Sequence, residues 1–497
     1  MLLRLEVDGF KNLLGVDLRF GAFSCIAGGN GVGKSNVFDA IEFIRMLATR
    51  ELRDAAASIR DSEGRRGDIP GLFYSSGTTK LDTMRLAVEM LVAKTGEDAL
   101  RQQAIATSTL LRYEVVLRLR NEESESGPIE VMSESLGHIT KGRASHHFLF
   151  PHSARDWRDP LVVANRRTQH GYLRTAIDDQ DRRVIHISQD GQAGRSQQRL
   201  AEPLPRTVLS SLSSADSATG VIARQEMASW NILQFEPTAL RNPDSFHDPT
   251  SIAPNGAHVP ATLNRLLGNG RASESESAAG TRQRIVNRLV GLVQNISDLS
   301  VERDEKRELF TILATLRDGT ELPARALSDG TLRFLALAVL EEASQSGLFC
   351  LEEPENGIYP DQVSSMLELL QHIAMDPHEA PDDDNALRQV IINTHSPSVV
   401  GRVPDDSLIF ANPGVDLSQR HQADDPLPCV TFSALPDTWR TDKAGTRKYA
   451  KAGMAAFLDP LGDTDSDRAT QSPQIKRVKD RDDLQMYLFS NHEGSKD

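Results

Sequence analysis

The sequence predicts an α/β fold in which polar loops follow the carboxyl ends of buried parallel strands. Three observations predict it. Residues 23–47 read as a strand, a glycine-rich loop and an amphipathic helix, and two short apolar runs, 348–351 and 390–392, each end in polar residues. Continuous apolar runs of this length are typical of strands covered on both faces. Ligand groups in such sheets gather beyond the carboxyl ends of the strands.

Length, charge and cysteine content narrow the class of protein. The 497 residues allow one large domain or two to three smaller ones. The formal net charge of −14 argues against a nucleic-acid surface over the whole chain, although it leaves room for a local basic groove. The three cysteines are far apart, so we expect reduced core residues. Apolar runs stay shorter than the roughly 20 residues that span a bilayer, and the charged N-terminus is unlike a signal peptide. We therefore expect a cytoplasmic protein.

The stretch Gly28–Ser35, GGNGVGKS, has the spacing of a phosphate-binding loop. A polyphosphate is densely negative, and backbone N–H groups converge on it only where side chains are absent. The helix expected after the loop adds its positive end. We therefore expect Lys34 to reach the β- and γ-phosphates of ATP and Ser35 to ligate Mg²⁺. The expected nucleotide contacts in this stretch are Asn30, Gly31, Gly33, Lys34, Ser35 and Asn36.

A capped amphipathic helix is expected within residues 326–340. Apolar residues recur there at helical spacing, and Ser328, Asp329 and Gly330 stand at its start. On its own this pattern indicates only a helix with a polar cap. Together with the phosphate-binding loop, Ser328 and Gly330 indicate a second phosphate-binding edge.

The apolar run 348–351 ends in Glu352 and Glu353. Carboxylates at the end of a buried strand are costly unless they bind a cation or take part in chemistry. Side chains alternate along a strand, so these two point in different directions. We expect Glu352 to face Mg²⁺ through water and Glu353 to face an attacking water molecule. A solvated strand end is the alternative.

The run 390–392 is followed by Thr394 and His395. A single histidine at a strand end is usually structural. This one follows a strand at the edge where ligand groups gather, so we expect it to contact the γ-phosphate.

The order of these motifs resembles the ATPase heads of ATP-binding-cassette (ABC) and chromosome-condensation (SMC) proteins. The signature LSDGT, followed by EEPENGIYP and THSP, is similar to the AAA-type predicted ATPases related to recombination and overcoming-lysogenisation-defect proteins. Residues 229–243 and 255–267 are also similar to the middle region of that family. The matching segments are Gly28–Ser35 as Walker A, Leu327–Thr331 as the signature, Leu348–Glu353 as Walker B, Glu355–Pro360 as the D-loop and His395 as the switch histidine.

The resemblance implies an α/β P-loop NTPase of ABC/SMC-head type, with a mixed sheet, an antiparallel subdomain and a helical lobe that carries the signature. It implies that two heads face each other and that each signature helix closes on the other's ATP, which predicts a homodimer or a higher assembly. Lys11, in the turn GFKNL, is expected to approach the nucleotide. The chain departs from the family in one respect: no glutamine can be assigned to the Q-loop, although residues 67–77 stand roughly in its place.

We expect four parts along the chain: residues 1–135 as the first ATPase lobe, 136–285 as an insertion of mixed structure, 286–412 as the rest of the head, and 413–497 as an extension of unknown role. Strands are expected at 84–91 and 111–120, joined by a loop or short helix. The serine- and glycine-rich stretches 210–220 and 269–280 are expected to be surface loops.

These features predict an ATPase whose biological role stays open between two alternatives. The first is an ATP-gated regulator or sensor in bacterial antiviral defence or DNA transactions, acting with a separate effector such as a nuclease. The second is a DNA-repair or recombination ATPase that binds DNA directly through its paired heads. The signature wording and the large insertion argue against the coupling subunit of a membrane transporter. A metal group of His146, His147 and His152 is not favoured, because carboxylate or cysteine partners at ligand spacing are missing.

Overall fold

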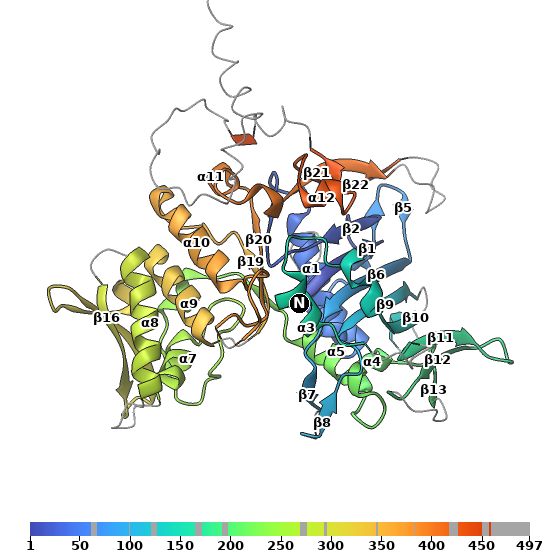
Figure 1. Ribbon diagram of the computed structural model, residues 1–497, viewed down its shortest axis with the longest axis horizontal. Helices are drawn as coiled ribbons and strands as arrows, with labels where there is room; N and C mark the ends of the chain where they lie inside the picture. Colours follow the sequence, from blue (N-terminus) through green and yellow to red (C-terminus); the bar gives the residue numbers. More distant parts are fainter. Residues whose placement is uncertain are drawn as a thin grey trace, which may run out of the picture.

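The computed structural model describes residues 1–60, 67–98, 100–120, 127–164, 171–190, 197–268, 276–292, 296–343, 346–382, 384–416, 426–449 and 457–458. These residues form an antiparallel sheet, a central mixed sheet and a lobe of helices with a small sheet of its own (Figure 1). The predicted α/β fold is confirmed. Within the described ranges, no helix has both the length and the apolar character needed to cross a membrane.

The antiparallel sheet has the strand order β13-β12-β11-β10-β9-β6-β1-β2. Its long strands alternate apolar and polar residues, which is typical of a sheet with one covered face. In β9, for example, the side chains are alternately buried and partly exposed. The strands are β1 (Leu2–Asp8), β2 (Val16–Arg19), β6 (Thr83–Leu91), β9 (Leu110–Leu119), β10 (Ile129–His138), β11 (Leu173–Ile177), β12 (Arg183–Ile187) and β13 (Gln197–Leu200).

The central sheet has the order β14-β19-β20-β3-β21-β22-β23. Neighbouring strands from β14 to β21 run parallel, and β22 runs antiparallel to β21. Every residue of β19 is buried, as its continuous apolar run predicts. The strands are β3 (Phe23–Ala27), β14 (Asn231–Leu233), β19 (Gly347–Glu352), β20 (Arg388–Thr394), β21 (Leu408–Asp416), β22 (Leu427–Ala434) and β23 (Arg447–Lys448).

Two different hydrophobic cores cover the two faces of the central sheet. Leu348, Cys350 and Ile391 pack in the same core as α1 (Lys34–Leu47) and the antiparallel sheet. Phe349 and Ile392 pack in the core of α9 (Asp329–Ala343) and α10 (Val363–Ile373). The helix that follows the glycine loop and the helix that carries the signature therefore lie on opposite faces of one sheet (Figure 1).

The helical lobe packs α9 and α10 with α6 (Pro237–Arg241), α7 (Val259–Leu266) and α8 (Glu276–Leu292). A small sheet of β15, β17, β16 and β18 completes it. Its strands are β15 (Asp244–Ser245), β16 (Ile296–Asp304), β17 (Leu309–Leu316) and β18 (Glu321–Pro323). The remaining helices and hairpin strands are α2 (Leu52–Ser58), α3 (Asp159–Leu161), α4 (Val208–Ser211), α5 (Ala218–Ala228), α11 (Pro397–Val400), α12 (Trp439–Asp442), β4 (Ser75–Ser76), β5 (Thr79–Lys80), β7 (Thr95–Glu97) and β8 (Gln103–Ile105).

Three local predictions need correction. The link between β6 and β9 is the hairpin β7–β8, where a loop or short helix was expected, because its short strands pair with each other and pack on α5. The stretch 210–220 was expected to be a surface loop, but it contains the end of α4 and the start of α5, which Ser217 caps by accepting a hydrogen bond from the Gly220 N–H. The stretch 269–280 includes the start of α8, and residues 269–275 lie outside the described residues.

The four predicted parts do not coincide with the sheets. The boundary after residue 135 falls inside β10, and β11–β13 extend the same antiparallel sheet. β14, within the expected insertion, forms the edge of the central sheet beside β19. β22 and α12 of the predicted extension also belong to the head, since β22 pairs with β21 and Arg440 of α12 bonds to Ser24 before the glycine loop.

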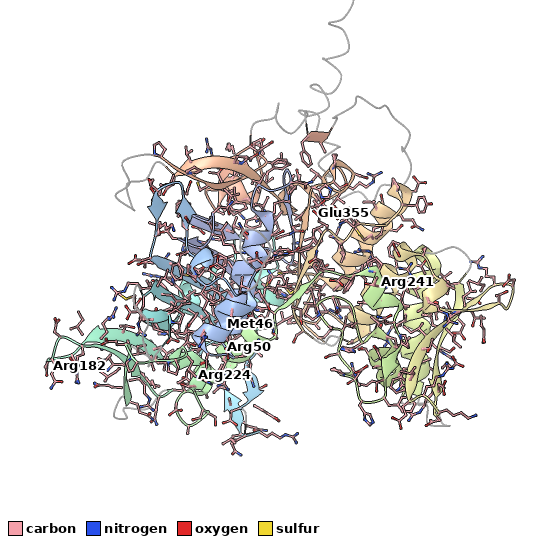
Figure 2. All side chains as sticks on the ribbon, turned by 180° about the vertical axis from the view of Figure 1, so that it is seen from behind. Met46, Arg50, Arg182, Arg224, Arg241 and Glu355 are labelled. Carbon is pink, nitrogen blue, oxygen red and sulfur yellow. The ribbon has the colours of Figure 1, made fainter. Side chains whose placement is uncertain are left out.

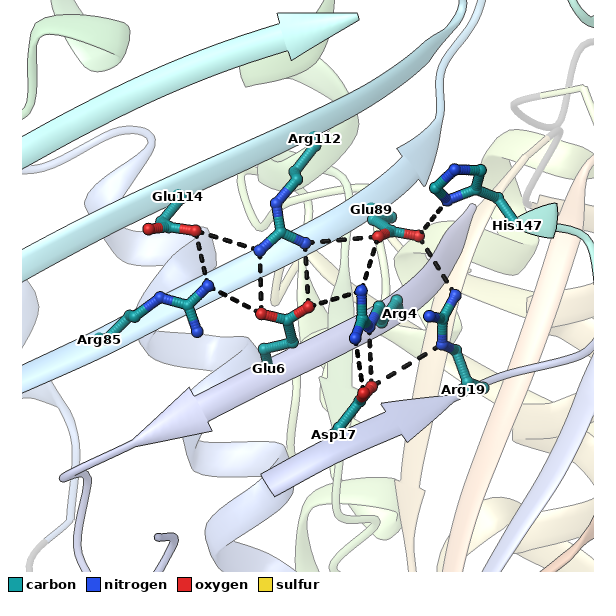
Figure 3. A network of polar contacts seen from close by, with 9 residues as sticks. All are labelled: Arg4, Glu6, Asp17, Arg19, Arg85, Glu89, Arg112, Glu114 and His147. Carbon is teal, nitrogen blue, oxygen red and sulfur yellow. Dashed lines mark hydrogen bonds and ion pairs between the residues drawn. The ribbon is translucent and has the colours of Figure 1, made fainter. Parts of the chain in front are cut away.

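Charged side chains form a network over the outer face of β1, β2, β6 and β9 (Figure 3). Glu89 is 2% exposed and accepts hydrogen bonds from Arg4 and Arg112, at 3.0 and 3.3 Å, and pairs with His147 at 2.7 Å. Its other members are Glu6, Asp17, Arg19, Arg85 and Glu114. Each carboxylate of the network contacts at least two arginines, so its negative charge is matched by positive neighbours.

Candidate nucleotide-binding site

The glycine loop joins the carboxyl end of β3 to the start of α1. Gly33 has φ +115°, and a Cβ there would lie 2.5 Å from the Asn12 side chain. Gly28 has φ +155°, and a Cβ there would overlap the carbonyl oxygen of Ala411. Both positions therefore require glycine. The loop between them leaves Asn30 and Gly31 exposed, with their backbone at the surface.

Lys34 lies under this loop. Its ammonium donates hydrogen bonds to the carbonyl oxygens of Gly28 and Gly29, at 2.8 and 2.7 Å. Burial lowers the pKa of Lys34, and the nearby charges of Glu353 and Glu355 act in the opposite direction. The structure therefore holds the lysine at the loop where the sequence predicts it.

Asn12 braces the loop from outside, a role that the sequence analysis missed. It donates a hydrogen bond to the carbonyl oxygen of Val32 at 2.9 Å and accepts one from Asn36 at 2.8 Å. Asn36, predicted to contact the nucleotide, is thus tied to the turn that precedes β2. Asn12 belongs to the GFKNL turn already singled out for Lys11, so the neighbouring position carried the signal.

Lys11 makes a buried ion pair with Asp39 of α1, at 2.7 Å. Asp39 also accepts a hydrogen bond from Arg60 at 2.9 Å, and Arg60 in turn pairs with Glu352. Lys11 is therefore held beside α1, and its approach to the nucleotide stays a prediction. The chain of charges Lys11, Asp39, Arg60 and Glu352 was not foreseen, since nothing in the local pattern marks Arg60.

Glu352 and Glu353 have different partners: Glu352 pairs with Arg60, and Glu353 is hydrogen-bonded to His395 and Asn356. Burial raises the pKa of Glu352, and its ion pair with Arg60 offsets part of the effect. Glu353 follows β19 and has φ +44°, a left-handed conformation that non-glycine residues rarely adopt. Such backbone strain is concentrated at functional sites.

Hydrogen bonds hold both carboxylate oxygens of Glu353. His395 Nδ1 lies 2.7 Å from Oε1, and Asn356 donates to Oε2 at 2.8 Å. Burial raises the pKa of Glu353, but the hydrogen bonds from Asn356 and His395 and the charge of Lys34 together lower it below its ordinary value. The carboxylate is therefore ionised near neutral pH and able to accept a proton.

Parallel strand register brings these groups to one edge of the central sheet. Glu352 is the partner of Asn393 in β20, and Ala27 at the end of β3 is the partner of Thr394. Ser35, in the first turn of α1, has its hydroxyl oxygen 3.5 Å from the Asn393 amide. Oxygen donors such as the Ser35 hydroxyl and the Glu352 carboxylate suit Mg²⁺, and the bare loop suits a phosphate.

The signature segment lies on the other face of the sheet. Ser328 is exposed and caps α9, because its hydroxyl accepts a hydrogen bond from the Thr331 N–H at 3.2 Å. Gly330 packs closely on the D-loop, where a Cβ would lie 3.2 Å from the Gly357 carbonyl oxygen. The structure thus joins the signature to the D-loop of the same chain and separates Ser328 and Gly330 from the glycine loop by the sheet.

Arg241 holds the signature from α6 and was also missed. It donates a hydrogen bond to the carbonyl oxygen of Leu327 at 3.2 Å and pairs with Asp329 at 2.5 Å. Figure 2 shows Arg241 in the helical lobe and Glu355 of the D-loop closer to the central sheet. Arg241 lies in the stretch 229–243 that resembles the related ATPases, which was the only sequence signal for it.

Two clusters of possible metal ligands have structural explanations. His147 pairs with Glu89, and His152 bonds to the Phe150 carbonyl oxygen, so each of these two histidines has a partner within the protein. Asp244, Asp248 and His258 each place a ligand atom within 4.8 Å of the others. Backbone N–H groups already occupy both carboxylates, Ala261 donating to Asp244 and Ser245 to Asp248.

Part of the sequence matches a known protein family. Residues 269–401 match the family model described as AAA domain, putative AbiEii toxin, Type IV TA system. The matched segment contains α9, β19, β20 and His395, and ends far from the glycine loop in sequence. No curated protein matches the sequence.

SMC heads are among the solved structures that match this chain. A head of Smc bound to the C-terminal winged-helix domain of ScpA has 13% identity and a TM-score of 0.45, covering 87% of this chain and 98% of that one. A Pyrococcus furiosus Smc head bound to the C-terminal domain of ScpA has 13% identity and a TM-score of 0.40, covering 87% and 96%. The Thermotoga maritima SMC head has 11% identity and a TM-score of 0.35, covering 86% and 98%.

Proposed function

We propose that this chain, whose residues 269–401 match an AAA-domain family model, binds and hydrolyses ATP as a dimer that gates a separate effector in bacterial defence. The observation that carries the proposal is the edge of the central sheet. There Lys34 and Ser35 follow a loop whose Gly28 and Gly33 positions require glycine, Glu352 ends β19, and Glu353 is hydrogen-bonded to His395.

In this proposal the chain's own groups divide the work of hydrolysis. The loop N–H groups and Lys34 bind the phosphates, and Glu353 accepts the proton of the attacking water. His395 orients the Glu353 carboxylate through their 2.7 Å hydrogen bond and faces the γ-phosphate. Mg²⁺, held by Ser35 with Glu352 behind it, would supply charge stabilisation for the triphosphate.

The position of the signature supports pairing of two heads. The central sheet separates Ser328 and Gly330 from the glycine loop of the same chain, so their phosphate-binding role needs a neighbouring copy. Tyr359, in the loop after Glu353, is 76% exposed. Tyrosine is enriched in protein interfaces, and this loop lies against the signature. We infer that ATP joins two copies and that hydrolysis separates them.

The defence role rests on the family that residues 269–401 match, whose description names a putative toxin of a toxin–antitoxin system. In this proposal the ATP-gated head acts on a partner protein that carries the effector chemistry. Proteins that co-purify with the ATP-trapped form from the native host would identify that partner. A protein that stays solitary in that form would count against the effector.

The test of the ATPase is the substitution Glu353→Gln in the full chain. We expect it to lower ATP turnover by ~10²–10⁴-fold, the usual cost of losing a general base, and to accumulate an ATP-dependent dimer in light scattering. Glu305→Gln, on the exposed turn after β16, is the matched control and should turn over ATP like the wild type. Equal turnover in both variants would refute the assignment of Glu353.

A further inference from the structure

The buried amide of Asn393 lies between the strand that leads to Glu353 and the strand that leads into the glycine loop. It lies near the end of β20, the strand between β19 and β3, and its partners are Glu352 on one side and Ile26 on the other. It is 1% exposed. An amide at this depth must find partners for its oxygen and its NH₂ group, because an unpaired buried polar group is costly.

The contacts of Asn393 fix the orientation of its amide. The backbone N–H of Glu353 donates to Asn393 Oδ1 at 3.0 Å and to the Asn393 carbonyl oxygen at 3.1 Å. A backbone N–H can only donate, so the side-chain oxygen must face Glu353 and the NH₂ group must face the other way. There Nδ2 lies 3.5 Å from the hydroxyl oxygen of Ser35 and donates to it.

We propose that Asn393 is a positioning residue that couples the metal-binding serine of the glycine loop to the water-activating glutamate. This inference rests on the proposed ATPase function and adds to it a residue that neither the motif pattern nor the family match assigns. One amide orients the Ser35 hydroxyl and also holds the backbone of Glu353, so the two groups keep a fixed relation across β20.

The effect on Ser35 follows from the lone pairs of a hydroxyl group. A serine oxygen has two lone pairs and one proton. The Asn393 NH₂ group takes one lone pair, which leaves the other free for a cation and directs the proton away from Asn393. A side chain that could only accept hydrogen bonds would instead compete for that proton and reorient the hydroxyl group.

The effect on Glu353 follows from its backbone. The left-handed conformation at φ +44° is unfavourable for glutamate and persists only where the surroundings hold it. Asn393 holds it by offering two oxygens to one N–H group. With the backbone held, the Glu353 side chain stays within reach of both His395 and Asn356.

Gln389 provides a matched control on the same strand. It is also buried, at 0% exposed, and an even number of residues separates it from Asn393, so both side chains point to the same face of the sheet. Among the described residues its amide bonds to backbone groups, accepting from the Leu2 N–H and donating to the carbonyl oxygens of Leu2 and Gly21, at 2.8 to 2.9 Å. It therefore has a structural role at the end of β20 far from Glu353.

The experiment compares Asn393→Ala, Asn393→Asp and Gln389→Ala in the full chain. Thermal melting, binding of a fluorescent ATP analogue and ATP turnover against Mg²⁺ concentration are measured for each. Groups that orient metal ligands usually change metal affinity or activity about 10- to 100-fold when mutated. We expect Asn393→Ala to lower kcat or to raise the half-saturating Mg²⁺ concentration by that factor, with little change in KM for ATP. Gln389→Ala should lower the melting temperature and leave both quantities unchanged in the folded protein.

Asn393→Asp keeps the shape and the acceptor for Glu353 but cannot donate to Ser35. It tests the serine contact even if the alanine variant fails to fold, and we expect a higher Mg²⁺ requirement. Wild-type kcat and Mg²⁺ dependence in the Asn393 variants, or equal changes in Gln389→Ala, would overturn the inference. A wild-type protein without ATP turnover would instead refute the proposed function, and Mg²⁺-dependent binding of the analogue would still report on Asn393.

Discussion

The charged network on the antiparallel sheet differs from the edge of the central sheet that holds Glu352 and Glu353. The two regions differ in how many opposite charges surround each carboxylate. In the network, arginines surround each carboxylate (Figure 3). Burial raises the pKa values of Glu6 and Glu89. Hydrogen bonds from Arg112 and Arg85 nevertheless lower the pKa of Glu6 to about 2, and those from His147 and Arg4 lower the pKa of Glu89 to about 2. At the central edge, Glu352 has Arg60 as its partner, and burial raises its pKa.

The difference separates stability from function. A carboxylate whose charge and hydrogen bonds are already satisfied by arginines stabilises the fold and has little capacity left to bind a ligand. At the edge of the central sheet, the pKa of Glu352 is raised, the backbone of Glu353 is in the left-handed conformation, and the loop positions Gly28 and Gly33 have no room for a side chain. A bound cation would offset the cost of burying the Glu352 carboxylate, and a bound phosphate would fit the glycine loop; perturbed groups of this kind are concentrated at functional sites. We therefore expect mutations in the network to change the free energy of unfolding, and mutations at the edge of the central sheet to change nucleotide binding or turnover.

The largest effect on stability is expected from Glu89→Ala. The substitution leaves Arg4, Arg19 and Arg112 partly buried without their shared partner, which typically costs about 3–5 kcal/mol. Urea denaturation followed by circular dichroism would measure the loss in the free energy of unfolding. Nucleotide affinity at a temperature where the variant is folded should match the wild type. A weaker nucleotide affinity would connect the network to the site and break the comparison.

Acid should weaken the network next. The pKa values of Glu6 and Glu89 are about 2 in the folded protein and about 4.5 when unfolded. Depressed pKa values stabilise the fold above the unfolded value, and that contribution is lost as pH falls from 5 towards 2. After allowance for solvent screening, we expect a loss of roughly 3 kcal/mol in the free energy of unfolding. Glu89→Gln should make this pH dependence shallower, and an unchanged slope would assign the acid sensitivity elsewhere.

A smaller effect in energy, confined to function, is expected from Lys34→Ala. A hydrogen bond to a charged group contributes about 1.5–3 kcal/mol, which corresponds to roughly 10- to 100-fold in nucleotide affinity. Titration of a fluorescent ATP analogue would measure it. The free energy of unfolding without nucleotide should change little, because the hydrogen bonds of Lys34 to the residues that the structure describes go to two loop carbonyls. Wild-type affinity for the ATP analogue in this variant would show that Lys34 does not bind the nucleotide.

Much of the candidate site could be predicted because its signals are local. The strand–loop–helix of residues 23–47 follows from apolar spacing and glycine placement, and the structure contains it. The cap at Ser328 and the buried strand before Glu352 follow in the same way. The hairpin β7–β8 was missed because polar, alanine-containing sequence favours a loop or helix locally, while contacts with α5 decide the strand pairing.

Arg60 and Arg241 could not be predicted as parts of the site, because each contacts a residue that is far away in the sequence. Arg60 meets Glu352 across 292 residues, and Arg241 meets Leu327 across 86. Exposed arginines are common, and no spacing rule distinguishes these two from the rest. Asn393 carried a weak signal, because it directly precedes Thr394 and His395, yet its partner Ser35 is 358 residues away.

The sequence by itself predicted the glycine-rich loop between a strand and a helix, and the carboxylates that follow a buried strand, because backbone freedom and apolar periodicity are properties of neighbouring residues. Only the tertiary structure decided that the signature lies across the sheet from the glycine loop, that Arg60 pairs with Glu352, and that Asn393 links Ser35 to Glu353. These relations depend on strand order and register in the central sheet. Side-chain pattern does not specify them, because many orders of the same buried strands would cover the same apolar surface.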